Sequence, residues 1–138
     1  GPGFRINELA RRPHTTGHWT QDGSVTSQFE QHLRAVLNLP LGATDLLGPV
    51  VVMKNFLGGE NQNLFSAYPA ALASEPAAKV HCYGKAVRPG RKIGHVNLVG
   101  SSVADVDSVR ERATTVANII RNGRAQSRTA AGAHEENA

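Results

Sequence analysis

The chain has 138 residues, and its 40% hydrophobic content is enough for one modest domain with a real core. The net charge is +4, but only 5% of the residues are aromatic, and the basic residues gather in short segments. Because a nucleic-acid-binding face needs a broad stripe of Lys and Arg, often with stacking aromatics, this pattern favours an anionic small molecule over nucleic acid.

The cysteine content and the hydropathy of the sequence indicate the cellular compartment in which the protein is expected. The single cysteine, Cys82, excludes an internal disulfide and any multi-cysteine zinc site, and it is compatible with a reducing cytoplasm. The sequence shows no signal peptide at its start and no apolar run near the roughly twenty residues of a membrane span. We therefore expect a cytoplasmic protein with no membrane partner.

The first predicted elements are a strand and a loop. Residues 4–9 alternate between apolar and polar side chains, as a half-buried strand does. A strand needs neighbours, which must come from later in the chain or from sequence outside it. Residues 10–23 carry proline and glycine between polar residues, which predicts a loop.

A helix is expected at residues 27–37. Ser27 and Glu30 have the spacing of a capping box, and apolar residues then recur on one helical face. The segment 39–42, Leu-Pro-Leu-Gly, ends this helix.

The second part of the chain predicts a mixture of strands and helices. The apolar run at 49–53 is typical of a buried strand, and Asn122-Gly123 is a good helix stop. The expected elements are a strand within 48–56, a turn at 58–59, a short helix at 67–74, strands at 79–83 and 92–99 joined by a tight connection at 84–90, a helix at 103–121, and a disordered tail beyond Arg124.

Two segments, 8–19 and 85–95, combine cationic side chains and histidines with glycine-marked turns. Glu8 lies on the same side of the predicted strand as the apolar residues, where a carboxylate needs a cation or hydrogen-bond donors. It can hold magnesium that bridges nucleotide phosphates, or it can be a strand-end carboxylate that pairs with Arg12 or with solvent.

The two histidines of the first segment lie one helical turn apart, but Pro13 and Gly17 predict a loop around them. Because no third ligand is evident, a zinc site is disfavoured. His14 and His18 can instead hydrogen-bond a ligand, or each can be a satisfied structural residue.

The second segment has two arginines and two lysines around the rigid Pro89-Gly90 turn. Arginine offers a planar fork for phosphate and lysine a compact charge, so the segment suits a phosphate site. The alternative is a solvated basic hairpin, which is common on protein surfaces.

Two common nucleotide motifs and one catalytic pair are not supported. There is no glycine-rich phosphate loop ending in Lys-Ser or Lys-Thr and no dinucleotide fingerprint. Neighbouring residues on a strand point to opposite faces, so His81 and Cys82 do not form a nucleophilic pair, and we expect a packed thiol.

Four ordered motifs carry a resemblance to a known family. They are the segments 7–18, 26–36, 39–42 and 83–95, and the likeness runs in register from about Asn7 to Arg121. The chain resembles the C-terminal part of N5-carboxyaminoimidazole ribonucleotide synthase, the ATPase subunit of phosphoribosylaminoimidazole carboxylase. This resemblance implies the end of an ATP-grasp domain followed by a small mixed C-terminal domain.

The resemblance also implies a reaction and its participants. Such a ligase uses ATP, magnesium and bicarbonate to carboxylate 5-aminoimidazole ribonucleotide in purine synthesis, and the family suggests a homodimer. By motif, Glu8 matches a metal-binding carboxylate, and Arg12 and His14 match residues that face the aminoimidazole ribonucleotide and the carboxylating centre. Lys85 and Arg91 match substrate-phosphate ligands, with Arg88 and Lys92 as supporting charges.

The chain departs from the family pattern in four residues and in length. Arg11 stands where the family usually has proline, and Thr15, Thr16 and Cys82 replace other residues near the expected site. The resemblance places the ATP-binding half before Glu8, outside this chain, so we expect no ATP turnover by these residues alone. A non-catalytic phosphoribonucleotide-binding or assembly module is the alternative function.

The expected domain organisation follows the motifs. Residues 1–42 are expected to form the end of the ATP-grasp domain, with a strand, an active-site loop and a helix. Residues 43–123 are expected to form a small α+β domain, and residues 124–138 a disordered tail.

Overall fold

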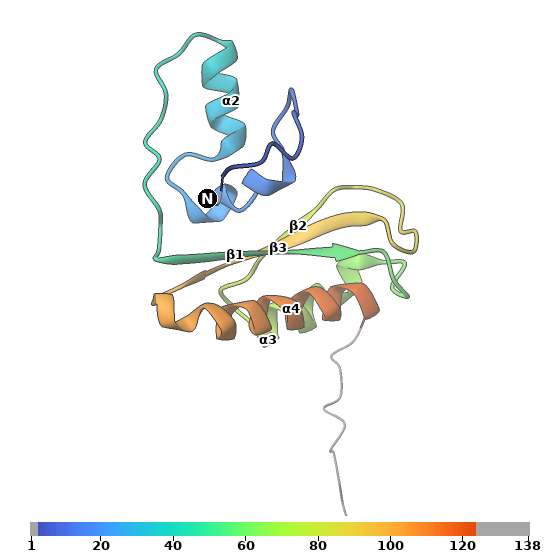
Figure 1. Ribbon diagram of the computed structural model, residues 1–138. Helices are drawn as coiled ribbons and strands as arrows, with labels where there is room; N and C mark the ends of the chain where they lie inside the picture. Colours follow the sequence, from blue (N-terminus) through green and yellow to red (C-terminus); the bar gives the residue numbers. More distant parts are fainter. Residues whose placement is uncertain (1–2, 124–138) are drawn as a thin grey trace, which may run out of the picture.

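A computed structural model describes residues 3–123. A three-stranded antiparallel sheet separates two layers (Figure 1). The helices α3 (Tyr68–Ser74) and α4 (Val106–Asn122) cover one face, and the N-terminal segment with α1 (Thr20–Gly23) and α2 (Gln28–Val36) lies on the other. The expected tail, 124–138, lies outside the described residues.

The sheet has the order β1-β3-β2, so β3 (Lys92–Gly100) is central. It pairs with β1 (Val50–Leu57) along the full length of that strand and with β2 (Lys79–Cys82) at one end. The strands predicted at 48–56, 79–83 and 92–99 are therefore confirmed within a residue or two at each end. The ladder continues past β2 through the Tyr83 amide, which donates to the Ile93 carbonyl.

Alternation along β3 decides which side chains reach which layer. Val96 and Leu98 belong to the apolar clusters that the sheet forms with α4. His95 and Asn97 alternate with them and point to the opposite face, where their rings and amides meet the N-terminal segment. Although both polar residues are buried, they therefore lie outside the apolar core.

The core lies between the sheet and α4. This helix buries one stripe, as the apolar spacing predicts, and Gly123 ends it in the left-handed conformation with φ 79°. A short 3-10 helix at Val103–Asp105 leads into it. The helices predicted at 67–74 and 103–121 are confirmed. The buried residues of α4 are Val109, Ala113, Val116, Ala117, Ile119 and Ile120.

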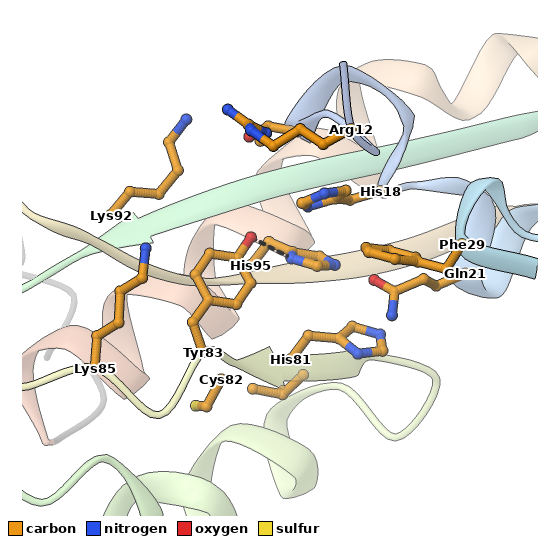
Figure 2. Close-up of a pocket in the computed structure, with 12 residues that line it drawn as sticks. Arg12, His18, Gln21, Phe29, His81, Cys82, Tyr83, Lys85, Lys92 and His95 are labelled. Carbon is orange, nitrogen blue, oxygen red and sulfur yellow. Dashed lines mark hydrogen bonds between the residues drawn. The ribbon is translucent and has the colours of Figure 1, made fainter. Parts of the chain in front are cut away.

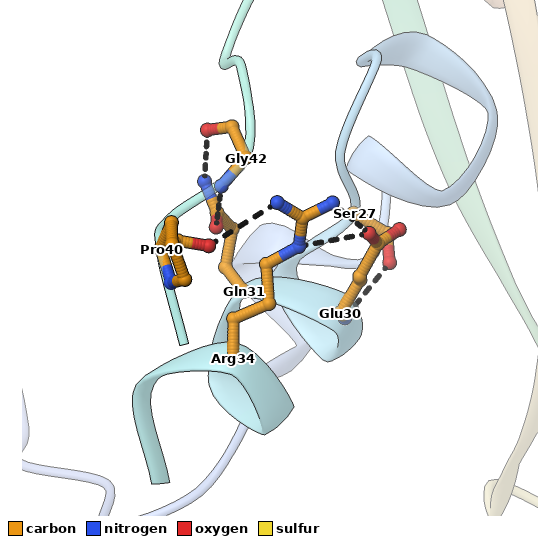
Figure 3. A network of polar contacts seen from close by, with 6 residues as sticks. All are labelled: Ser27, Glu30, Gln31, Arg34, Pro40 and Gly42. Carbon is orange, nitrogen blue, oxygen red and sulfur yellow. Dashed lines mark hydrogen bonds and ion pairs between the residues drawn. The ribbon is translucent and has the colours of Figure 1, made fainter. Parts of the chain in front are cut away.

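The helix predicted at 27–37 is also confirmed, because α2 begins after Ser27, whose hydroxyl accepts from the Glu30 amide. The segment after α2 is tied back to it by side chains (Figure 3). The Gln31 amide bonds the Gly42 backbone in both directions, and Arg34 pairs with Glu30 and donates to the Pro40 carbonyl.

The apolar face of α2 is not covered within the described residues. Phe29, Leu33 and Val36 are 37%, 58% and 63% exposed, and no residue of the helix is buried. Neither apolar cluster contains a residue from the part of the chain before β1. The amphipathic pattern therefore predicts the helix correctly, but the described chain does not bury its apolar face.

The strand predicted at 4–9 is wrong for this structure. The segment is extended but unpaired, and Phe4, Ile6 and Leu9 are almost fully exposed. Strand pairing needs a neighbouring edge, and residues 4–9 are paired with neither edge strand of the described sheet, β1 or β2. The loop predicted at 10–23 contains a 3-10 turn, Thr15–Gly17, and the single turn of α1.

No helix within residues 3–123 combines the length and the hydropathy that a bilayer crossing requires.

Candidate functional site

A cleft of about 740 Å³ lies between the N-terminal segment and the exposed end of the sheet (Figure 2). Residues 12–29 form one wall, and β2, β3 and the connection after β2 form the other. Its lining residues are Arg12, Thr15, His18, Gln21, Phe29, Val80, His81, Cys82, Tyr83, Lys85, Lys92 and His95.

Three cationic side chains surround the mouth of this cleft. Arg12 reaches it from the N-terminal segment, and Lys85 and Lys92 reach it from the connection after β2 and the start of β3 (Figure 2). The Lys85 ammonium lies 5.4 Å from the centroid of the Tyr83 ring, which is within cation–π range. Because the three charges come from both walls, an anionic ligand in the cleft can contact all of them.

Aromatic and imidazole rings form the interior of the cleft. The His81 and His95 rings stack with centroids 4.6 Å apart, and the His18 ring lies 5.6 Å from His95. Phe29 extends this group, with its centroid 5.0 Å from that of His18, and Tyr83 closes it beside His95. A planar heterocycle can therefore stack here while its charged substituent meets the cations.

The buried imidazole of His95 is neutral near pH 7. Burial is the main cause that lowers its pKa to about 4, and the neighbouring His81 and His18 act in the same direction. The Tyr83 hydroxyl is 2.7 Å from His95 Nδ1 in a hydrogen bond, and burial raises the Tyr83 pKa. Burial also lowers the pKa of the His18 imidazole, as it does for His95.

A polar joint links the two walls behind the rings. The Asp22 carboxylate accepts hydrogen bonds from His81 Nε2 at 2.6 Å and from Asn97 Nδ2 at 2.7 Å. Asn97 Nδ2 also donates to the His18 carbonyl at 3.2 Å. The segment that carries Arg12 is thereby bonded to the strands that carry the lysines.

The residues predicted from the sequence do not all meet in this cleft. Arg12, Lys85 and Lys92 line it, and His14 lies next to its lining residue Thr15. Arg88 and Arg91 are exposed and lie outside the lining, and Arg91 makes only a 3.5 Å contact with the Ala86 carbonyl.

The predicted metal ligand has a different partner in this structure. Glu8 Oε1 lies 2.6 Å from His14 Nε2, and the Glu8 side chain is 56% exposed. No group of three or more metal-ligating side chains occurs among residues 3–123, zinc-type groups included. The magnesium role of Glu8 therefore stays a prediction, and a magnesium site there would need further ligands.

Cys82 packs against the apolar core, as expected for a thiol without a catalytic partner. Its sulfur is 2.9 Å from the Tyr68 hydroxyl, and burial together with this contact raises the Tyr68 pKa. Both residues line the cleft, but the His81 ring stacks on His95 and bonds Asp22 on the face of β2 opposite to the Cys82 sulfur.

Sequence reasoning missed the histidine cluster and Asp22. His81 and His95 are direct partners in the β2–β3 register. The signal that could have found this pair is the short connection between the two predicted strands, which favours their pairing as a hairpin. No local pattern could bring His18 and Asp22 to them, because those residues come from a segment without regular pairing.

Two family models match separate parts of this chain. Residues 51–109 match the family described as phosphoribosylaminoimidazole carboxylase C-terminal domain, and residues 3–29 match the ATP-grasp domain family. The chain is 53% identical over 119 residues to N5-carboxyaminoimidazole ribonucleotide synthase from Corynebacterium ammoniagenes, covering 85% of this chain and 28% of that protein.

Solved structures show the same relationship. The phosphoribosylaminoimidazole carboxylase ATPase subunit from Aquifex aeolicus aligns with a TM-score of 0.69 and 47% identity, over 80% of this chain and 33% of that one. An Aspergillus clavatus N5-carboxyaminoimidazole synthase, solved with ADP and 5-aminoimidazole ribonucleotide, aligns with a TM-score of 0.63 and 33% identity, over 79% of this chain and 29% of that one.

These matches confirm the expected α+β fold, with the end of an ATP-grasp domain before a small mixed domain. The chain spans about 28% of the length of the curated relatives from Corynebacterium ammoniagenes and Mycobacterium bovis that it matches. In both sequence and structure, the chain is similar to the C-terminal portion of N5-carboxyaminoimidazole ribonucleotide synthases, the part that contains their C-terminal domain.

Proposed function

We propose that this chain forms the ribonucleotide-binding wall of an ATP-dependent ligase that carboxylates 5-aminoimidazole ribonucleotide in purine synthesis. The observation that carries this proposal is the convergence of Arg12, Lys85 and Lys92 on one ring-lined cleft. A ribonucleotide has both a phosphate for the cations and a planar base for the rings.

The proposed roles follow the motifs and the cleft. Arg12 and His14 face the aminoimidazole and the carboxylating centre, and Lys85 binds the substrate phosphate with support from Lys92. Arg91 and Arg88 are exposed beside this position, so their contribution requires their side chains to turn toward the bound phosphate.

The reaction needs ATP, bicarbonate and magnesium in addition to these residues. When bound, magnesium neutralises charge on the transferring phosphoryl group, and Glu8 would supply one of its ligands. A Glu8 that held magnesium would leave its 2.6 Å contact with His14, and the imidazole would then be free to hydrogen-bond the reacting group. Preorganised cations around the cleft stabilise negative charge while the enclosed site keeps water from a labile carboxylating intermediate.

We further propose that turnover requires the ATP-binding part that the longer relatives possess. The uncovered apolar face of α2 supports this, because such a face is stable when a further protein surface covers it. The segment 1–42 would belong to that ATP-binding domain, with 43–123 as the substrate-side domain. A cytoplasmic location and a homodimer are parts of the same proposal.

A non-catalytic ribonucleotide-binding or assembly module is the second candidate. It is favoured by the fact that the three converging cations all lie within these 138 residues. Neither candidate involves nucleic acid or membrane.

Calorimetry tests the ribonucleotide binding that both candidates share. Titration with 5-aminoimidazole ribonucleotide should show binding and titration with ATP should not. Lys85→Ala should weaken ribonucleotide binding strongly, with a smaller loss for Arg91→Ala, whereas Lys79→Ala, a control on β2 outside the cleft lining, should leave it unchanged. Equal affinity of wild type and Lys85→Ala would contradict the phosphate role, and phosphate release from ATP with bicarbonate would contradict the need for a further part.

A further inference from the structure

The joint at Asp22 is the most concentrated polar contact between the two walls of the cleft. Both hydrogen bonds to this residue end on the same oxygen, Oδ2, and their donors come from different strands, His81 on β2 and Asn97 on β3. The Asp22 side chain is 17% exposed and Asn97 is fully buried, so water competes weakly for these bonds.

Apolar packing between the walls is limited by comparison. The two apolar clusters lie on the other face of the sheet and contain no residue of the N-terminal segment. On this face, the strands meet α1 through Gly23 against Val51 and through the stacked imidazoles. The position of the segment on the sheet therefore depends strongly on the Asp22 bonds.

We propose that Asp22 is a positioning residue for the ribonucleotide site. It holds the segment that carries Arg12 at a fixed place over the strands that carry Lys85 and Lys92, so that cations from both walls meet one ligand. Asp22 itself does not line the cleft. This inference rests on the proposed function for the identity of the ligand, but the geometry of the joint does not depend on it.

Without the Asp22 bonds, the N-terminal segment should lie in its place over the strands in a smaller fraction of the molecules. We call this placement the closed arrangement, and the ribonucleotide affinity should fall with its population. If Asp22→Ala leaves that arrangement in roughly one molecule in ten, the apparent dissociation constant for the ribonucleotide rises about tenfold. Asp22→Asn keeps the shape and one acceptor but loses the charge, so its effect should lie between wild type and Asp22→Ala. Glu30→Ala removes an exposed pair with Arg34 in the same half of the chain. It should change neither the ribonucleotide affinity nor the amide exchange at 17–24.

Hydrogen exchange on the ligand-free protein tests the joint without assuming any ligand. Asp22→Ala should speed exchange of the amides at 17–24 about tenfold while the amides of α4 keep their wild-type protection. Unchanged exchange at 17–24 would overturn the proposal. If Asp22→Ala unfolds the whole sheet, Asp22→Asn decides the question: faster exchange confined to 17–24 supports positioning, and wild-type exchange contradicts it.

Calorimetry with 5-aminoimidazole ribonucleotide then tests the link to the site. If wild type does not bind, the proposed function fails while the exchange result still stands for the joint. If wild type binds and Asp22→Ala, with its loosened segment, binds equally well, the proposed function stands and the positioning role is overturned.

Discussion

The buried imidazole of His95 makes a quantitative prediction about stability and pH. Its pKa is about 4 in the folded protein, against an ordinary value of 6.5. Because the folded state binds this proton less tightly than the unfolded state, the stabilising contribution of neutral His95 is present above pH 6.5 and is lost as the pH falls toward 4. Linkage gives a loss of about 2 kcal/mol between pH 7 and pH 5 and about 3 kcal/mol in full.

The test compares wild type with His95→Asn, which cannot titrate in this range. Urea unfolding at a series of pH values yields the free energy of unfolding for each protein. Carboxylates such as Glu75 also contribute to acid sensitivity, so the relevant quantity is the difference between the two profiles. That difference should shrink by about 2 kcal/mol between pH 7 and pH 5, because wild type alone pays to charge residue 95.

A matched control comes from an exposed histidine. His32 lies on α2 and is exposed, so His32→Asn controls for the loss of a histidine outside the buried cluster. Parallel profiles for wild type and His95→Asn would refute the argument, since they would mean that burial among His18, His81 and Tyr83 does not disfavour the charged imidazole.

Two further predictions concern the part of the chain that forms the sheet, α3 and α4. Arg112→Ala should destabilise the protein by about 1 to 2 kcal/mol near pH 7, because it removes the 2.6 Å bond to Glu75, which is 8% exposed. Since Arg112 lowers the Glu75 pKa, the effect should fade in urea unfolding as the pH drops through that lowered value, and a pH-independent effect would contradict it. Gly123→Ala should cost about 1 kcal/mol in thermal unfolding because of its positive φ, and an unchanged melting temperature would contradict the αL cap.

The elements that could be predicted from the sequence are those whose signals are local. The helix at α2 follows from Ser27 and the apolar spacing after it, and the helix at α4 follows from its buried stripe and Gly123. The strands of the sheet are apolar runs between clear turns. Each signal depends on neighbouring residues alone, so tertiary context did not alter it.

The strand predicted at 4–9 failed because alternation states only that a segment suits a sheet. A strand must also pair with a neighbouring edge, and in residues 3–123 this segment pairs with neither β1 nor β2, the two edge strands of the sheet. The same limit applies to Glu8, whose carboxylate was placed by that alternation and which in the structure pairs with His14.

The candidate site was only partly predictable. Basic residues around a rigid turn indicated Lys85 and Lys92, and motif resemblance indicated Arg12. The stacked histidines and Asp22 required the register of β2 with β3 and the fold of an irregular segment over them. Sequence spacing carries no information on the contact between the irregular N-terminal segment and the strands.

Nuclear magnetic resonance mapping of 5-aminoimidazole ribonucleotide binding tests the central claim most directly, because it reports where the ligand lies as well as whether it binds. The account predicts shifts at amides on both walls of the cleft, around Arg12 to His18 and around His81 to Lys92, and unshifted amides along α4. Shifts confined to one wall, or shifts centred on another surface, would contradict a ribonucleotide site between the N-terminal segment and the sheet.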